Sequence, residues 1–408
     1  MSIPAGAAIC LVPTEDGRIR DLVSGAFATI TRAGDACIWD ASCESVKCFP
    51  ANRVPVVPWS NHQPGARGYA FEPWEARTNA FLETLLDDAA ALATWTADAN
   101  LTAALAASSH IASGFDAALA ASGGTAALWR TYTATAVTRS ISCYAFRDDL
   151  AAVTSADAQL CAAAGTSTPV GTLLTTTYTD VGNGVYRLRA TYTGTAATWA
   201  AGIALKDGAS LKVFGLQDEA GSSAGLIIPT TTVTVTRPAI SISFPSTALT
   251  QASGTLVAVC RVGQAVGYKG VARWAYDSDN YVGMYTFDTL ATTGFRRAAT
   301  STTDVETIAS NTNYILASSW TAGAASALRL YKNGVCNSPV NNPADFAVTL
   351  GSTIDVGQLG GSLHFNSPIA ALVWYPSALP AAQVLALNSL VSGVPTAGAG
   401  RKMILGLV

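Results

Sequence analysis

TDVGNGVYRLRATYTG, residues 179–194, opens the stretch that decides the fold, and GLIIPTTTVTVTR, residues 225–237, closes it. The opening turn, Gly182-Asn183-Gly184, consists of residue types that tolerate positive φ. A period of two follows and predicts a strand with one buried and one solvent-facing side. The buried parity would hold Tyr186, Leu188, Ala190 and Tyr192, and the solvent-facing parity would hold Val185, Arg187, Arg189 and Thr191.

Further strands are predicted on both sides of this one. Residues 211–216 read as the next strand and residues 233–236 as an extended exit, while alternating positions run through residues 129–146 upstream. Residues 81–89 favour a helical turn because Ala has high helix propensity, whereas Thr94–Thr96 is similar to an early strand of the jelly-roll family described below. These strands predict one antiparallel β-sandwich.

A second strand series begins near Pro238. Residues 240–244 alternate strictly, and residues 255–262 form a nearly continuous apolar strand of the kind whose two faces are both covered. Asn333-Gly334 is the preferred pair for a two-residue hairpin turn. An apolar strand at 369–375 and a short helix at 377–385 complete a second predicted sandwich.

Two resemblances rest on motifs in these stretches. DVGNGVYRL at 180–188, VFGLQDEAG at 213–221 and IIPTTT at 227–232, with FEPWEARTN upstream at 71–79, resemble the carbohydrate-binding-module-type jelly roll of tailed-bacteriophage tail-fibre and head-fibre proteins. LYKNG at 330–334, VG at 356–357, the strand ending in Trp374-Tyr375 and ALPAAQV at 378–384 resemble a concanavalin-type, laminin G-like sandwich over about Ile240 to Leu390. The resemblances imply a virion protein with two lectin-like domains.

The predicted fold class is therefore all-β, with two antiparallel sandwiches behind an irregular N-terminal arm. The predicted parts are the arm at 1–80, the jelly roll at 81–237, the laminin G-like sandwich at 238–392 and a C-terminal tail at 393–408. Prolines keep the first part extended. It would either attach the protein to a particle or lie as a strap over its own domain.

Composition limits the function classes. A net charge of −3 and a pI near 5.6 disfavour a nucleic-acid partner, which usually selects a basic patch. The chain contains no run of about 18 apolar residues, so no membrane insertion is expected. Its N-terminus has no basic region ahead of an apolar run, which predicts synthesis in a cytoplasm.

The cysteines fit a cytoplasmic origin. Cys37, Cys43 and Cys48 form a cluster, but neither a CxxC spacing nor a nearby histidine supports zinc. A reducing compartment favours free thiols at these three positions, although the sequence leaves open whether any two of them pair.

No catalytic arrangement is predicted. The histidines are His62, His110 and His364, and no Ser-His-Asp or Cys-His set can be assembled around them. Phosphate-binding glycine motifs are absent from the sequence. We expect no enzyme and no obligatory cofactor; calcium is a weak candidate at Asp277 and Asp279, since turn chemistry explains the same residues.

The predicted glycan-contacting residues crowd the tip and flanks of one hairpin: Trp274, Tyr276, Asp279, Asn280 and Tyr281. An exposed aromatic ring stacks on a sugar while carboxylates and amides bond its hydroxyls. Strand alternation would place Trp274 and Tyr276 on one face, both buried or both exposed.

The leading hypothesis is a structural virion protein, a fibre, spike or decoration component that contributes to host-surface glycan attachment. Its partners would be other virion subunits and host polysaccharide, and it would be a homo-oligomer, with a trimer as the expected state. The alternatives are a free carbohydrate-binding or glycan-depolymerising protein and an assembly connector without glycan affinity. The position on tail, head or baseplate and the glycan itself are left open.

Overall fold

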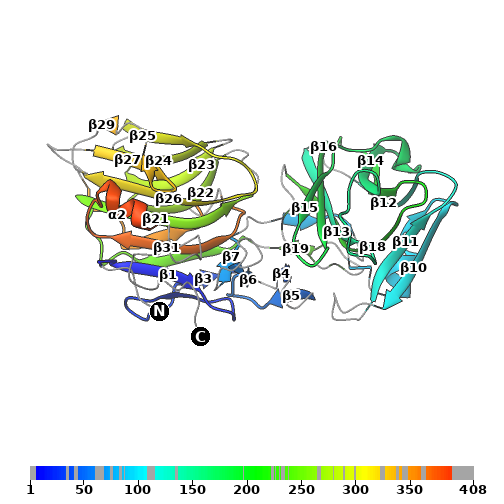
Figure 1. Cartoon of the computed structure of the whole chain (residues 1–408), viewed down its shortest axis with the longest axis horizontal. Coiled ribbons are helices and arrows are strands. Elements are labelled where there is room, and N and C mark those ends of the chain that lie inside the picture. Colours follow the sequence, from blue (N-terminus) through cyan, green and yellow to red (C-terminus); the bar gives the residue numbers. More distant parts are fainter. Residues whose placement is uncertain are drawn as a thin grey trace. The chain divides into compact units, whose positions relative to one another are not determined.

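The computed structural model describes most of the chain. The described residues are 6–33, 36–40, 45–59, 69–73, 77–81, 85–86, 88–107, 115–133, 137–195, 197–221, 225, 227–228, 230, 235–237, 239–263, 268–278, 280–287, 290–297, 300–321, 327–336, 340–341, 348–359 and 364–387. Its sheets are antiparallel, which confirms the all-β prediction. Figure 1 shows the chain as two bodies of strands.

Each body draws on separate parts of the sequence. Unit 1 consists of Met1–Gly34, Phe49–Glu75 and Ala239–Val408, and unit 2 of Asp35–Cys48 and Ala76–Pro238. The region predicted as an N-terminal arm is thus shared between the units, and its strands pair with strands from much later in the chain. The predicted tail at 393–408 lies outside the described residues.

The described strands of unit 1 form two sheets. Across its larger sheet the order is β2 (Ile19–Asp21), β1 (Ile9–Pro13), β31 (Ile369–Tyr375), β21 (Ser253–Val262), β26 (Thr312–Thr321), β27 (Ala327–Lys332) and β28 (Val335–Cys336), with β29 (Val340–Asn341) on β27, β7 (Tyr69–Phe71) on β31 and β6 (Val56–Pro58) on β7. Across the other sheet the order is β25 (Thr300–Thr307), β24 (Leu290–Arg297), β23 (Tyr281–Phe287), β22 (Tyr268–Ala275), β30 (Thr353–Val356), β20 (Ser241–Pro245) and β3 (Thr29–Thr31).

The core of unit 1 follows from the apolar central strands. β21 is buried at nearly every position, which confirms that both of its faces are covered. One face packs with Ile315, Val373 and Trp59 beneath helix α2 (Ala381–Ala386), which inserts Val384. The Asn333-Gly334 turn between β27 and β28 has positive φ at both residues, as a tight hairpin requires.

Unit 2 is also built from two main sheets. The larger runs β10 (Leu101–Ala107), β11 (Phe115–Ala121), β18 (Ser210–Ala220), β13 (Thr138–Phe146), β16 (Tyr186–Thr193) and β15 (Thr177–Asp180), with β8 (Arg77–Asn79) on β18 and β19 (Val235–Arg237) on β8. The smaller runs β14 (Ala158–Ala164), β17 (Thr198–Leu205), β12 (Ala126–Thr133) and β9 (Thr96–Ala97). Helix α1 (Ala89–Ala93), a 3-10 turn at Pro169–Gly171, and the pair β4 (Ala36–Asp40) and β5 (Ser45–Phe49) complete it.

The strand β16 shows where alternation succeeds and where it fails. Leu188 and Ala190 face the core between the sheets, as predicted. Arg187, predicted to face solvent, is buried instead, because its guanidinium donates to the Gly225 carbonyl. A second apolar cluster that includes Val185 lies on the same side, so the prediction of a solvent-facing side is wrong at Val185 and Arg187, whereas Thr191 is exposed as predicted.

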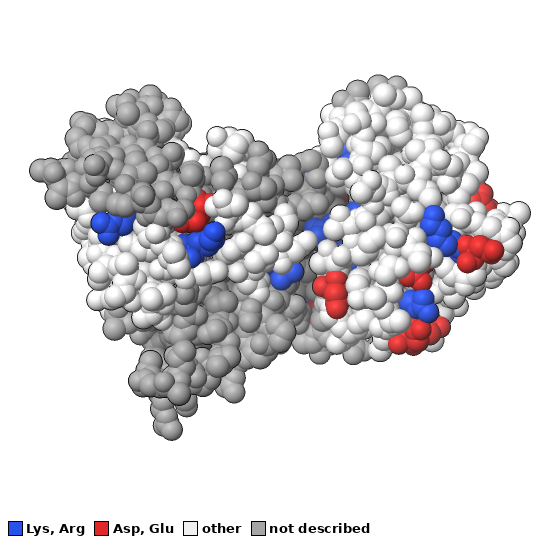
Figure 2. Space-filling view, turned by 45° about the horizontal axis from the view of Figure 1, so that its top comes forward, with Lys and Arg blue, Asp and Glu red and all other residues white. Residues whose placement is uncertain are grey.

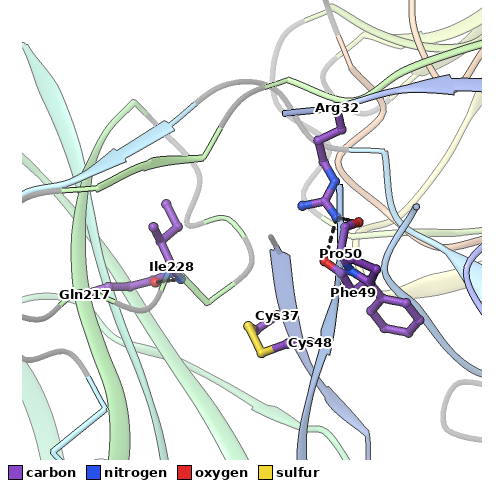
Figure 3. The surroundings of a disulfide bond; sticks show 7 residues. All are labelled: Arg32, Cys37, Cys48, Phe49, Pro50, Gln217 and Ile228. Atoms are coloured by element: carbon purple, nitrogen blue, oxygen red, sulfur yellow. Dashed lines mark hydrogen bonds between the residues drawn. A yellow bond between two sulfur atoms is a disulfide. The ribbon is translucent and has the colours of Figure 1, made fainter. Parts of the chain in front are cut away.

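The β4–β5 hairpin closes that second cluster and carries a disulfide. Cys37 and Cys48 are joined in this hairpin, as Figure 3 shows. Cys37 is buried and forms a β-bridge with Ile227, whose neighbour Ile228 donates its N–H to the Gln217 side chain at 3.0 Å. The expectation of free thiols is therefore wrong for Cys37 and Cys48, since the pairing of β4 with β5 places them 4.1 Å apart at Cα; Cys43 lies outside the described residues.

Candidate functional site

The hairpin of β22 and β23 in unit 1 presents two different faces. Val282 and Met284 point into the core with Trp274. The other parity holds Tyr281, Gly283, Tyr285 and Phe287 on β23. This second side carries aromatic residues without being fully buried, and it is the candidate site.

Of two residues predicted to share one environment, one is buried and the other is exposed. Trp274 is 5% exposed, and its indole N–H donates to the Gly351 carbonyl at 2.6 Å. Tyr276 is 61% exposed. The inference that they share one environment is wrong, because β22 ends at Ala275 and alternation no longer applies in the turn that follows.

The turn is held by its own polar groups. Asp277 accepts a hydrogen bond from the Asn280 backbone N–H at 2.8 Å and another from its side-chain amide at 3.1 Å. Asn280 is buried, and its carbonyl accepts from the Tyr276 N–H at 2.9 Å. Asp279 lies outside the described residues, so calcium binding by Asp277 and Asp279 stays a prediction. Within the described ranges no group of at least three His, Cys, Asp or Glu could hold a metal ion.

The aromatic face, as we name it, consists of Tyr268 on β22 and Tyr281, Tyr285 and Phe287 on β23. Tyr268 stands directly opposite Phe287, and their rings stack with centroids 4.3 Å apart. Tyr285 is tilted against Tyr268 at 5.7 Å. Tyr268 is 49% exposed, so one of its surfaces is open to solvent while its neighbours fix the ring.

A cation lies at the other end of the aromatic face. The Arg273 guanidinium sits 4.7 Å from the centroid of the Tyr281 ring and donates to the Asp277 carbonyl. Arg273 stands opposite Gly283, which in turn pairs with Gly294 on β24. Gly283 is buried, so its backbone is not open to solvent beside Arg273.

Burial acts on the Tyr285 hydroxyl of this face. It raises the pKa of Tyr285, and the neighbouring Tyr281 and Tyr268 raise it further. The phenol therefore stays neutral at any physiological pH and can both donate and accept a hydrogen bond. Flat rings, neutral hydroxyls and one guanidinium are the groups that polyhydroxylated ligands use.

A second polar cluster lies between the sheets of unit 2. Arg139 on β13 forms an ion pair with Asp218 on β18, and both side chains are almost fully buried. The Tyr192 hydroxyl donates to Asp218 at 2.6 Å and also meets the Tyr132 hydroxyl from the opposite sheet. Burial raises the pKa of Asp218 to about 7 despite these partners. The cluster joins the two sheets through polar groups that bond one another.

Sequence reasoning missed both groupings. Tyr285 and Phe287 were not singled out, although their spacing by two on β23 is a signal that alternation offers. Tyr268 and Arg273 are five residues apart on β22, and they share one side of the sheet only because the register shifts between Gly270 and Ala272. Arg139 and Asp218 are 79 residues apart and carry no local signal.

Charged side chains are sparse on the surface shown in Figure 2, where blue and red atoms lie in small separate groups. Of the described residues no helix is long and apolar enough to cross a membrane.

Comparison with known proteins gives only partial likenesses. No protein-family model and no curated protein matches the chain. Solved structures that match include the CBM40 of a Ruminococcus gnavus IT-sialidase bound to α2,3-sialyllactose, with 14% identity and a TM-score of 0.30 over 34% of this chain and 83% of that one. The receptor-binding domain of botulinum neurotoxin type G matches at 9% identity and a TM-score of 0.31, over 37% of this chain and 40% of that one. The binding domain of botulinum neurotoxin DC, in complex with rat synaptotagmin II, matches at 7% identity and a TM-score of 0.32, over 38% and 40%. Likeness at these TM-scores assigns neither a family nor a ligand to this chain.

Proposed function

We propose that unit 1 binds glycans through the aromatic face. The observation that carries the proposal is the pair of Tyr268 and Phe287, stacked at 4.3 Å with Tyr268 still 49% exposed. An aromatic ring that is fixed from behind and open in front suits stacking against the C–H face of a pyranose, because little conformational freedom is lost on binding.

The polar groups beside the rings would orient the sugar. Arg273 is half-buried and held over Tyr281, where its remaining N–H groups can donate to sugar hydroxyls or to the carboxylate of an acidic sugar. The Tyr281 and Tyr285 hydroxyls can donate and accept within the same face. We propose recognition without cleavage, since none of these groups is a carboxylate pair of the kind that glycoside hydrolysis uses.

The proposed setting is a tailed-phage or phage-like particle, in which this chain is a fibre, spike or decoration component. It is supported by the resemblance of the 180–188, 213–221 and 227–232 motifs to phage fibre jelly rolls. A free glycan-depolymerising protein would release oligosaccharides from host polysaccharide, and an assembly connector would bind particles but no glycan.

The binding test uses an array of bacterial surface polysaccharides as probe. Tyr268→Ala should weaken the affinity for bound glycans about tenfold, because one stacking contact is lost, and Arg273→Ala should weaken it comparably. The matched control is Phe27→Ala, which removes another exposed ring, 43% accessible and covered by Arg18 at 4.4 Å, away from this hairpin.

Unchanged array binding by both Tyr268→Ala and Arg273→Ala, with circular dichroism showing folded protein, would overturn the proposed site. Antibody labelling of intact particles tests the setting separately. Labelling at one structural position supports the virion role, and soluble protein in the absence of particles opposes it.

A further inference from the structure

Among the described strands, the outermost strand of the larger sheet of unit 2 pairs on one side only. β10, Leu101–Ala107, pairs with β11 over all of its residues in one unbroken register, from Leu101 opposite Ala121 to Ala107 opposite Phe115. Figure 1 shows the two strands side by side at the end of unit 2. No described hydrogen bond reaches the other side of β10 from Thr102 to Ala107.

The direction of the backbone groups on this edge follows from the neighbouring strand. Ala121 donates its N–H to Ala209 and accepts from Gly208, so its polar groups point away from β10. Because antiparallel pairs alternate between bonded and non-bonded, the bonded pairs toward β11 are those of Thr102, Ala104 and Ala106. The N–H and C=O groups of Ala103, Leu105 and Ala107 therefore point outward, away from the sheet.

The described edges of the other main strands in unit 2 are covered or short. β14 is covered by the following segment, in which Leu174 donates to the Leu160 carbonyl at 2.8 Å and Ala162 donates to the Thr172 carbonyl at 3.3 Å. β15 is four residues long and ends in Asp180, and β9 has two residues. Short strands, charges and covering segments are the devices that keep sheet edges from pairing with other chains.

β10 itself is neither short nor charged, and although helix α1 lies close to it, no described backbone group bonds its outer edge from Thr102 to Ala107. Its sequence, LTAALAA, contains no charge, no proline and no bulge over seven residues. We propose that this edge pairs with the β10 edge of a second copy of the chain, in antiparallel orientation, so that the larger sheets of two copies become one continuous sheet. The inference concerns assembly and goes beyond the glycan-binding function proposed for unit 1.

The strand is self-complementary in this arrangement. A two-fold axis at Ala104 would place Ala103 opposite Leu105 and Leu101 opposite Ala107 of the other copy, so each larger side chain meets a small one. Residues of equal parity meet, which keeps the core-facing side of one copy continuous with that of the other. About six hydrogen bonds would form, because Ala103, Leu105 and Ala107 offer both groups while the Leu101 N–H already donates to Asp98. A contact with this two-fold symmetry uses the same edge of both copies, so it produces a dimer and not a trimer.

The first test is Ala103→Pro in the full chain. The Ala103 N–H points outward, so proline removes a donor of the interface without removing a hydrogen bond to β11. Analytical ultracentrifugation should show a dimer for the unchanged protein, and the variant should dissociate at concentrations about tenfold higher or more. A monomeric unchanged protein at tens of micromolar, or an undiminished dimer in the variant, would overturn the proposal.

The second test does not depend on how proline is tolerated. Ala104 would face Ala104 of the other copy as a non-bonded pair, whose Cα separation of about 4.5 Å suits a disulfide. Ala104→Cys should form covalent dimers under mild oxidation. Thr102→Cys is the matched control, exposed on the same strand but opposite Ala106 of the other copy, and should stay uncrosslinked. Equal crosslinking of the two variants, or none by Ala104→Cys, would refute this register and the proposal with it.

Discussion

The ion pair of Arg139 and Asp218 gives the sharpest test of how unit 2 is held together. Arg139→Met removes the cation that lowers the pKa of Asp218, so the fully buried Asp218 side chain must take up a proton or stay charged without a cationic partner. Tyr192 still donates to Asp218 at 2.6 Å, but one neutral donor does not replace an ion pair. Breaking a buried pair from one side costs about 3–5 kcal/mol, so we expect Arg139→Met to lower the free energy of unfolding by roughly that amount at pH 8.

An exposed ion pair in the same unit supplies the control. Lys212 contacts Asp148 at 2.7 Å, but the Asp148 side chain is 76% exposed. Water screens such a pair, and Asp148→Ala should cost at most about 1 kcal/mol. A second control is the double variant Arg139→Met with Asp218→Leu, which removes both charges and should recover much of the loss because apolar groups of similar volume replace the pair.

Native-state hydrogen exchange of peptides from β13 and β18 is the suitable assay, because it reports the opening free energy of unit 2 without requiring both units to unfold together. The reasoning is refuted if Arg139→Met changes these free energies no more than Asp148→Ala does. A double variant as unstable as the single one would show instead that the loss comes from packing.

Three further predictions concern stability. Gly202→Ala should lower the free energy of unfolding by about 3 kcal/mol or more, measured by denaturant titration, because its Cβ would overlap the Leu128 carbonyl and lie 2.6 Å from Trp129 Cα. Since burial raises the pKa of Asp218 from 3.8 to about 7, the folded protein holds its proton more tightly than the unfolded chain. This contribution to the free energy of unfolding is complete below about pH 4 and is lost as the pH rises to about 7. Thermal unfolding should therefore show stability falling with pH across this range in the unchanged protein, and the fall should be missing in Asp218→Asn. Equal dependence on pH in the two proteins would contradict the prediction. Cys37→Ser should cost about 3 kcal/mol, because the disulfide closes a loop with a sequence separation of 11; an unchanged melting temperature would show that the hairpin is held without it.

The sequence predicted those elements whose signal is local. Alternation placed Leu188 and Ala190 in the core of unit 2, the apolar run at 255–262 predicted the fully covered strand β21, and Asn333-Gly334 predicted a tight turn. In each case period or residue type acts over a few neighbouring residues, so the rest of the chain is not needed.

Features that depend on distant segments could not be predicted in this way. Arg187 is buried because the segment at Gly225 lies over it, and the pairing of Cys37 with Cys48 depends on a hairpin that spacing alone does not define. At the candidate site, alternation failed for Tyr276 because β22 ends one residue earlier. The aromatic face requires the register of β22 against β23, which brings Tyr268 opposite Phe287.

Ring-proton NMR of tyrosine-labelled protein, titrated with polysaccharide fragments from the array, tests glycan binding by the aromatic face most directly. Signals of Tyr268, Tyr281 and Tyr285 should shift together, because these rings share one face of unit 1. Tyr132 and Tyr192, partly buried against the core of unit 2, should stay unchanged and serve as internal controls. Glycan binding that leaves the first three signals in place, or the absence of any shift at millimolar fragment, would contradict the account.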